Sequence, residues 1–294
     1  MNISLRNSIT ALLFAAASTG ALAENNKVVS PDGRLVVNVE DRDGRLYYDV
    51  FYDGKQMMLP SQLGVVANIG DFSQRLVYRS VSNRKIADDY TMRGTKTSAV
   101  SYRANQMSVV YANDKKLPMT VTFNVSDNDI AFRYEFGNVN DRTHIIIDKE
   151  TTAFRLPLQT TTFLSPQSDP MIGWMRTKPS YEEEYTPDAP MTAKSKYGRG
   201  YTFPCLFHVG EDGWVLVSET GTHGNYPGCR LSDYSADQGY KLEFPMAGEC
   251  DGRGAANAAF TLPGATPWRT ITVGSTLKPI VETTVSYDVV KPLY

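Results

Sequence analysis

The sequence has little of what nucleic-acid binding or membrane insertion requires. Its 30 Lys and Arg residues nearly balance its 32 Asp and Glu residues, and no cationic block resembles a phosphate-binding stripe. Beyond the N-terminus, no stretch approaches the roughly 20 apolar residues that a membrane-spanning helix needs. We therefore expect neither nucleic acid as a partner nor a membrane span.

Catalytic motifs are also missing. The three histidines, His144, His208 and His223, lie too far apart for an H-E-x-x-H metal site, and the chain has neither a G-x-S-x-G elbow nor a P-loop. A catalytic triad assembled in space has nothing in its favour except the presence of Ser, His and Asp. The sequence therefore nominates no catalytic residue.

Cysteine is scarce, with only Cys205, Cys229 and Cys250 present. Their wide spacing fits no zinc pattern. One disulfide and one free thiol can form in an oxidising compartment, but buried small apolar residues are the favoured interpretation.

The first 23 residues are typical of a secretory signal peptide. Arg6 precedes an apolar run that starts at Ala11, and Ala21-Leu22-Ala23 forms a small-x-small cleavage site. We expect an exported chain, in the periplasm or outside the cell.

The rest of the chain is dominated by short alternating runs of apolar and polar residues. Such runs, typical of half-buried strands, cover 34–41, 45–52, 119–125, 130–136, 202–209, 214–219, 268–274 and 282–290. Asp43-Gly44 and Asp53-Gly54 between or after these runs are hairpin-turn signals. No window keeps a helical period with caps, so helices should be few and short. The pattern predicts an all-β fold, a large antiparallel β-sandwich, and the lack of a fixed repeat argues against a propeller.

One long segment, residues 165–200, breaks this alternation. It is rich in proline, and long irregular loops in compact domains are usually functional or disordered. Its rings Trp174, Tyr181 and Tyr185 argue against disorder and suit stacking on the apolar face of a sugar, although packing onto the sandwich is as good an interpretation.

The same segment carries three adjacent carboxylates, Glu182, Glu183 and Glu184. Carboxylate oxygens are the ligands that Ca²⁺ prefers. On an extended segment alternate side chains face opposite ways, so only Glu182 and Glu184 can share a face. A solvated surface run is favoured over a metal or sugar ligand.

Two further pairs of residues could have a structural or a catalytic role. Trp268 and Arg269 open a strand, where a structural role is favoured: Trp268 closing the core and Arg269 making a fork to a carboxylate. A mutarotase-like epimerase would need a converging His and Glu, for which His208 with Glu219 is the pairing to test.

Several segments, taken together, resemble the N-terminal domain of glycoside hydrolase family 97, which comprises exported bacterial α-glucosidases and α-galactosidases. They are "VVSPDGRLVVNV", "DIAFRYEF", "SYEEEY", "ETGTHGNYPGCRLS" and "TPWRTITVG", in the family's order and near its spacing. The resemblance implies a galactose-mutarotase-like β-super-sandwich over residues 27–289, with 290–294 as the start of a linker to a (β/α)₈ barrel that this chain lacks.

The resemblance also implies a function. The chain would be the non-catalytic, carbohydrate-binding part of a glycosidase acting on an α-linked oligosaccharide, packed on its own barrel and inactive alone. One Glu of the "SYEEEY" loop would reach a Ca²⁺ shared with the barrel, best matched by Glu182 with Glu184 as the register-shifted rival. Trp174, Tyr181 and Tyr185 would line the substrate pocket. The alternative is a free-standing, secreted carbohydrate-binding module.

Overall fold

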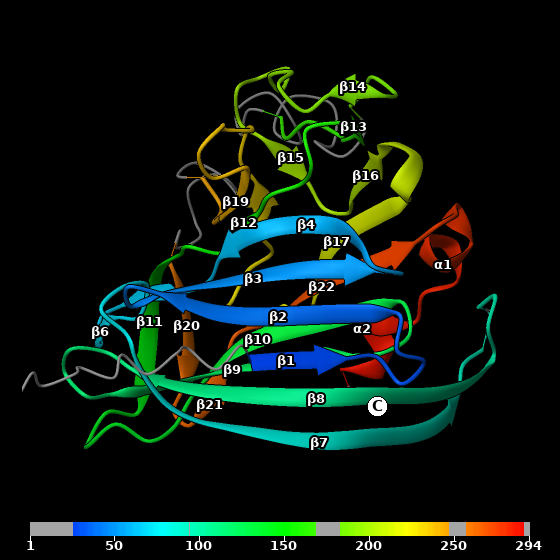
Figure 1. Ribbon diagram of the computed structural model, residues 1–294. Helices are drawn as coiled ribbons and strands as arrows, with labels where there is room; N and C mark the ends of the chain where they lie inside the picture. The colour runs from blue at the N-terminus through cyan, green and yellow to red at the C-terminus, as the bar shows by residue number, and fades with distance from the viewer. Residues whose placement is uncertain (1–25, 94, 169–182, 247–256, 291–294) are drawn as a thin grey trace, which may run out of the picture.

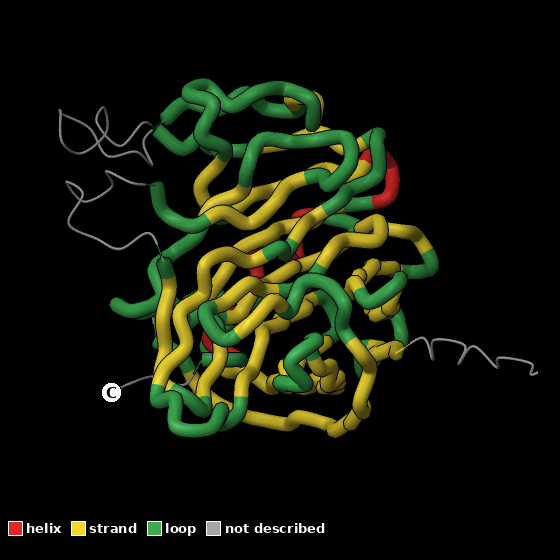
Figure 2. The backbone as a smooth tube through the Cα atoms, turned by 90° about the vertical axis from the view of Figure 1, so that its left-hand side faces the viewer, coloured by secondary structure: helices red, strands yellow, loops and turns green. Residues whose placement is uncertain are grey.

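The fold is built almost entirely from antiparallel strands. The computed structural model describes residues 26–93, 95–168, 183–246 and 257–290. Figure 2 shows that helices take up only short segments of the traced backbone. The predicted all-β class is confirmed.

The strands of the described residues fall into four sheets, with the orders β1-β2-β3-β4, β14-β13-β16-β17-β22-β10-β9-β8-β7 (β21 also pairing with β10), β20-β11-β5-β6 and β12-β19-β18-β15. Their bounds are Asn26–Val29 (β1), Leu35–Arg42 (β2), Arg45–Tyr52 (β3), Lys55–Gln62 (β4), Val65–Ala67 (β5), Gly70–Asp71 (β6), Val77–Thr91 (β7), Ala99–Ala112 (β8), Pro118–Val125 (β9), Asp129–Phe136 (β10), His144–Glu150 (β11), Ala153–Phe154 (β12), Thr160–Phe163 (β13), Ala189–Pro190 (β14), Tyr201–Thr202 (β15), Cys205–Val209 (β16), Trp214–Thr220 (β17), Arg230–Leu231 (β18), Tyr240–Glu243 (β19), Ala258–Thr261 (β20), Gly264–Ala265 (β21) and Trp268–Gly274 (β22).

The β1–β4 sheet packs face to face on the middle of the largest sheet, as Figure 1 shows. Along β2 and β3, every second side chain points toward the core, and Tyr48 on β3 is one of these and is fully buried. Its ring lies 5.3 Å from that of Phe132 and 6.1 Å from that of Phe123. This aromatic contact joins the two sheets into one core, and the predicted sandwich is confirmed.

The predicted hairpin turns form where the sequence places them. Asp43 and Gly44 have φ of 53° and 76°, and Asp53 and Gly54 have φ of 50° and 76°. Positive φ at both central residues is the geometry of the tight turn whose twist matches the flanking strands. The Asp-Gly pairs therefore set the register of β2, β3 and β4.

The end of the chain differs from the prediction. The run 282–290, expected to be a strand, forms part of two short helices, α1 (Leu277–Glu282) and α2 (Val285–Asp288). Thr276 caps α1, because its hydroxyl accepts a hydrogen bond from the amide of Lys278 at 3.3 Å. The alternation in the sequence was misleading because the segment lies on the outside of the sheet, where only Val285 is buried.

Within the described residues, no helix is long and apolar enough to cross a membrane.

Candidate functional site

The described part of the long loop, residues 183–200, lies at the top of the molecule in Figure 1, beside β13, β15 and β16. Glu183 is buried, and its Oε2 accepts hydrogen bonds from Lys196 Nζ and Tyr197 Oη, both at 3.0 Å. This contact raises the pKa of Lys196. The expectation of a uniformly solvated acidic run is therefore wrong at Glu183, which ties the two sides of the loop together.

Close packing of the backbone holds the far side of this loop. The amide of Gly200 donates to Ser195 Oγ at 2.9 Å, and the amide of Ser195 donates to Asp233 Oδ1 at 2.8 Å. Gly200 has a φ of 80°, and a Cβ there would overlap the carbonyl oxygen of Leu231. Only glycine fits this approach between the loop and β18.

A pocket of about 400 Å³ opens between this loop and the end of the largest sheet. Its lining includes Glu184, Tyr185, Lys194 and Lys196 from the loop and Tyr201 from β15. Glu184 is exposed, and Tyr185 is 52% exposed. An exposed ring beside carboxylate and ammonium groups is what stacking on a sugar and hydrogen bonding to its hydroxyls requires.

The predicted ligands are only partly within reach of the structure. Glu184 and Tyr185 lie together at this pocket. Trp174, Tyr181 and Glu182 lie outside the described residues. Among the described residues, no three acidic, His or Cys side chains gather closely enough to hold a metal ion. Glu184 is thus a single carboxylate, which does not by itself fit the 6–8 oxygen ligands of Ca²⁺.

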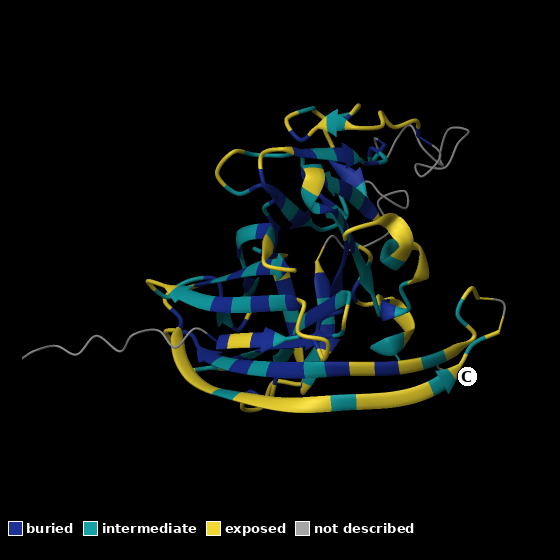
Figure 3. Ribbon diagram, turned by 45° about the vertical axis from the view of Figure 1, so that its right-hand side comes forward, coloured by how far each residue is buried: buried dark blue, intermediate teal, exposed yellow. Residues whose placement is uncertain are grey.

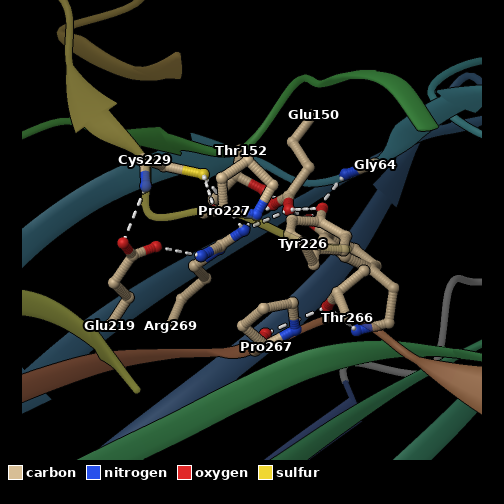
Figure 4. A network of polar contacts seen from close by, with 11 residues as sticks. Gly64, Glu150, Thr152, Glu219, Tyr226, Pro227, Cys229, Thr266, Pro267 and Arg269 are labelled. Atoms are coloured by element: carbon tan, nitrogen blue, oxygen red, sulfur yellow. Dashed lines mark hydrogen bonds and ion pairs between the residues drawn. The ribbon is translucent and has the colours of Figure 1, made fainter. Parts of the chain in front are cut away.

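A second cluster of charged groups, whose contacts Figure 4 shows, is buried within the fold. The guanidinium of Arg269, fully buried on β22, forms ion pairs with Glu150 at the end of β11 and with Glu219 on β17. Arg269 Nε also donates to Glu150 Oε2 at 3.3 Å. The predicted fork from Arg269 to a carboxylate is confirmed, with two carboxylates as partners.

The surrounding groups satisfy the remaining oxygens of these carboxylates. Tyr226 Oη and Thr152 Oγ1 both donate to Glu150, Thr152 at 3.0 Å. The amide of Cys229 donates to Glu219 Oε1 at 2.7 Å. Burial raises the pKa of Glu219, and the Arg269 guanidinium opposes that shift.

This network holds the turn 221–229 on the sheet. Its donors Tyr226 and Cys229 both come from that turn, and its carboxylates sit on separate strands. Sequence reasoning missed the partners of Arg269 because Glu150 is 119 residues away and Glu219 is 50 residues away. The neighbouring Trp268 is buried beneath Arg133, whose guanidinium lies 4.2 Å from the ring centroid, so its structural role is confirmed.

The proposed pairing of His208 with Glu219 does not form. His208 lies opposite Trp214 across β16 and β17 and stacks on its ring at 4.1 Å. Trp214 and Glu219 are five positions apart on one strand and therefore face opposite sides of the sheet. The epimerase alternative loses its only candidate pair.

The described cysteines match the favoured interpretation. Cys205 is fully buried and Cys229 is partly buried, and both carry free thiols. Burial raises the pKa of each thiol. Cys250 lies outside the described residues.

Comparison with solved structures places this fold among glycosidases. A crystal structure described as a β-arabinopyranosidase is 53% identical and superimposes with a TM-score of 0.89, over 92% of this chain and 43% of its own. A glycoside hydrolase family 97 enzyme from Pseudoalteromonas sp. strain K8, in complex with panose, superimposes with a TM-score of 0.71 at 19% identity, over 88% of this chain and 37% of its own.

Comparison with curated proteins agrees. A probable retaining α-galactosidase from Streptomyces bingchenggensis (strain BCW-1) is 24% identical over 280 residues, which are 95% of this chain and 39% of that protein. This chain thus spans about two fifths of the length of the relatives it matches. The sequence profile of the glycosyl-hydrolase 97 N-terminal domain matches residues 28–292. Because that match covers nearly the whole sequence, the chain belongs to the glycosyl-hydrolase 97 N-terminal family.

Proposed function

We propose that this chain is the non-catalytic, carbohydrate-facing N-terminal domain of an exported family 97 glycosidase. The observation that carries the proposal is the match of residues 28–292 of this chain to the N-terminal family. The relatives with which this chain aligns are more than twice as long. Glycoside hydrolysis needs two carboxyl groups about 5–9.5 Å apart across the sugar, and we assign both to a (β/α)₈ barrel outside this chain. The chain alone is then inactive.

The substrate class that we propose is an α-galactoside or a β-L-arabinopyranoside. The 53% identical structure is described as a β-arabinopyranosidase and the curated relative as an α-galactosidase. These two sugars share the configuration at C1 to C4 and differ at C5, which carries an exocyclic CH₂OH group only in galactose. A site shaped for one ring therefore accommodates the other, with the space around C5 deciding between them. An α-glucoside is the less supported choice.

The contribution of this domain to the substrate would come from the loop 165–200. Tyr185 borders the pocket of about 400 Å³ together with Glu184 and two lysines, which supports a sugar-lining role. Trp174 and Tyr181 would add stacking surface from the same loop. The pocket belongs to the wall of the site, and the bond to be cleaved would lie in the barrel.

Calcium belongs to the same proposal. Glu182, or Glu184 in the shifted register, would supply one carboxylate to a Ca²⁺ whose other ligands come from the barrel. Bound there, the ion would supply a Lewis acid beside the scissile bond. The described residues offer too few ligands to hold the ion without the barrel, so we expect weak binding by this chain alone.

Exposed apolar side chains support docking of a further domain near the C-terminal helices. Leu277 and Val281 are 42% and 53% exposed and lie one turn apart on α1, and Tyr287 on α2 is 54% exposed. Apolar groups at the point where the chain leads to its linker are suited to a permanent contact with the barrel. We propose that they form part of that interface.

The test is to compare the full gene product with this chain. The full enzyme should hydrolyse p-nitrophenyl α-galactoside or β-L-arabinopyranoside and lose activity in EGTA, while this chain should be inactive. In the full enzyme Glu182→Gln should raise the Ca²⁺ concentration for half-maximal activity at least about tenfold, whereas the control Glu211→Gln, in the short 3-10 turn before β17, should not. No hydrolysis of either glycoside by the full product would overturn the proposal.

A second function, a free-standing sugar-binding module, is favoured by the presence of the pocket within this chain. Calorimetric titration of this chain with galacto- and arabino-oligosaccharides distinguishes the two. Binding with a Kd of about 0.1 mM or tighter, abolished by Tyr185→Ala and independent of any barrel, would favour the module.

A further inference from the structure

Strand β7 forms a long and regular edge of the largest sheet. It runs 15 residues from Val77 to Thr91, closes one side of the largest sheet, and contains neither proline nor glycine. It pairs with β8 along its whole length, with a single irregularity between Tyr78 and Ser80. Figure 1 shows it at the outer margin of the molecule and Figure 3 shows it largely exposed. Long regular edges of this kind are templates for strand addition.

The hydrogen-bonding groups that β7 turns outward can be assigned from its end. The amide of Met92 donates to the carbonyl of Ser98 at 2.7 Å, so residues 92 and 98 form a hydrogen-bonded pair with β8. Hydrogen-bonded pairs alternate along an antiparallel ladder. Even-numbered residues from 82 to 92 therefore bond to β8, and odd-numbered residues from 81 to 91 direct their amides and carbonyls away from it.

Charged side chains on an edge usually prevent strand addition, because a single sign repels an identical partner. The charges of β7 have a different pattern: Arg84 and Lys85 precede Ile86 and Ala87, and Asp88 and Asp89 follow. On each face of the strand a cation therefore comes four residues before an anion. Reversing the direction of the strand exchanges cation for anion, so the edge is complementary to itself.

Geometry restricts how two such edges can pair. A two-fold axis between antiparallel copies must match odd residues with odd residues, because only these direct their backbone groups outward. An axis at Ile86 meets this condition. It places Arg84 of each copy opposite Asp88 of the other, which gives two equivalent pairs, and it places Ile86 opposite Ile86. All of these residues are at non-hydrogen-bonded positions, where side chains approach most closely. Lys85 then lies opposite Ala87 of the second copy, with Asp89 and Lys85 of that copy at its two diagonals, so the direct Arg84–Asp88 pairs carry the complementarity.

We propose that a second copy of this chain binds to β7, antiparallel and about a two-fold axis at Ile86, so that two of the largest sheets join into one continuous sheet. Arg84 and Asp88 are the residues that set this register. Among the described residues no ion pair involves Lys85 or Asp88, whereas Asp89 is held by Arg103 of β8 at 3.0 Å. The surface is separate from the sugar-facing loop at the opposite end of the molecule (Figure 1) and does not depend on the proposed function.

The experiment is sedimentation equilibrium of this chain, and of the full gene product, at low and high salt. Both should form a dimer that weakens with added salt, because the contacts are exposed ion pairs. Asp88→Arg turns two attractive contacts into two repulsive ones and should weaken association by about tenfold or more. The exchange variant Arg84→Asp with Asp88→Arg restores complementarity and should restore the dimer.

Two further variants test whether the backbone of β7 makes the contact and whether the effect of charge is specific to this edge. Ala87→Pro removes an outward amide that β8 does not use, so it should abolish the dimer while circular dichroism stays unchanged. The control Asp237→Arg, on the exposed turn before β19, should dimerise like the parent chain. A chain that stays monomeric up to roughly 0.5 mM, well above the Kd of a weak specific complex, overturns the proposal. So does a dimer that Asp88→Arg and Ala87→Pro leave intact.

Discussion

Arg269→Met should destabilise the fold more than any surface substitution. The guanidinium of Arg269 is fully buried and pairs with two carboxylates, those of Glu150 and Glu219, whose side chains are 0% and 9% exposed. Methionine fills much of the same volume, so the cavity is small, but both carboxylates lose their counter-charge. Breaking a buried ion pair from one side costs about 3–5 kcal/mol.

That cost is a large fraction of the total free energy of unfolding, which for a domain is about 5–15 kcal/mol. At about 2 °C per kcal/mol for a chain of this size, Tm should fall by about 6–10 °C. The loss should be smaller at pH 5 than at pH 8. Burial raises the pKa of Glu219 and the Arg269 guanidinium opposes that shift, so removing the guanidinium raises this pKa further. The folded variant then takes up a proton more readily than the folded parent, and its stability declines more steeply as pH rises.

The assay is urea unfolding at both pH values, followed by tryptophan fluorescence. The matched control is Arg34→Met, which removes the exposed ion pair with Asp53 at 2.6 Å and should cost less than about 1 kcal/mol. Adding Glu150→Gln and Glu219→Gln to Arg269→Met should recover part of the loss, because no unpaired charge stays buried. An Arg269→Met variant as stable as the Arg34→Met control would refute the reasoning.

Three other predictions concern separate parts of the fold. No cation among the described residues pairs with Asp129, and burial raises its pKa to about 6, so stability should fall as pH rises from about 4 to 6. Asp129→Asn should remove this dependence and add about 2–3 kcal/mol at pH 7 in urea titrations, and an unchanged pH profile would contradict this. Gly200→Ala should cost about 2 kcal/mol or more in the same assay, since its Cβ would overlap the Leu231 carbonyl; a smaller loss would mean that the loop shifts easily. Cys205 should resist iodoacetamide until the protein unfolds, and the partly buried Cys229, whose thiol pKa is also raised, should react far more slowly than in unfolded protein, as peptide mapping by mass spectrometry would show. Rapid labelling of Cys205 in the native state would refute its burial.

Local patterns carried most of the fold prediction. The side-chain period of two along 45–52 and 130–136 and the Asp-Gly pairs are local properties, and the strands and turns formed accordingly. The same rule failed at 282–290, because a short alternating run fits a helix lying on a sheet almost as well as a strand. Nothing local in that run recorded that β22, the strand before it, already lies between β17 and β10 with both of its edges paired.

The candidate site was predicted less completely. Residue types alone singled out Tyr185 and Glu184, which do line one pocket. They did not reveal that Glu183 turns inward to Lys196 and Tyr197, because that depends on how the loop folds back over 13 residues. Whether Glu182 meets calcium depends on ligands beyond this chain, and it stays a prediction.

The sequence by itself determined the class of fold, the tight turns and the complementary charges along β7, since each depends on residues close together in the chain. It also determined the family, because several short segments in order identify it. Only the tertiary structure decided which carboxylates face Arg269, that His208 and Glu219 lie on opposite sides of the sheet, and that β7 is an edge. These facts join residues far apart in the chain. Their proximity is set by the packing of whole sheets, which no short stretch of sequence encodes.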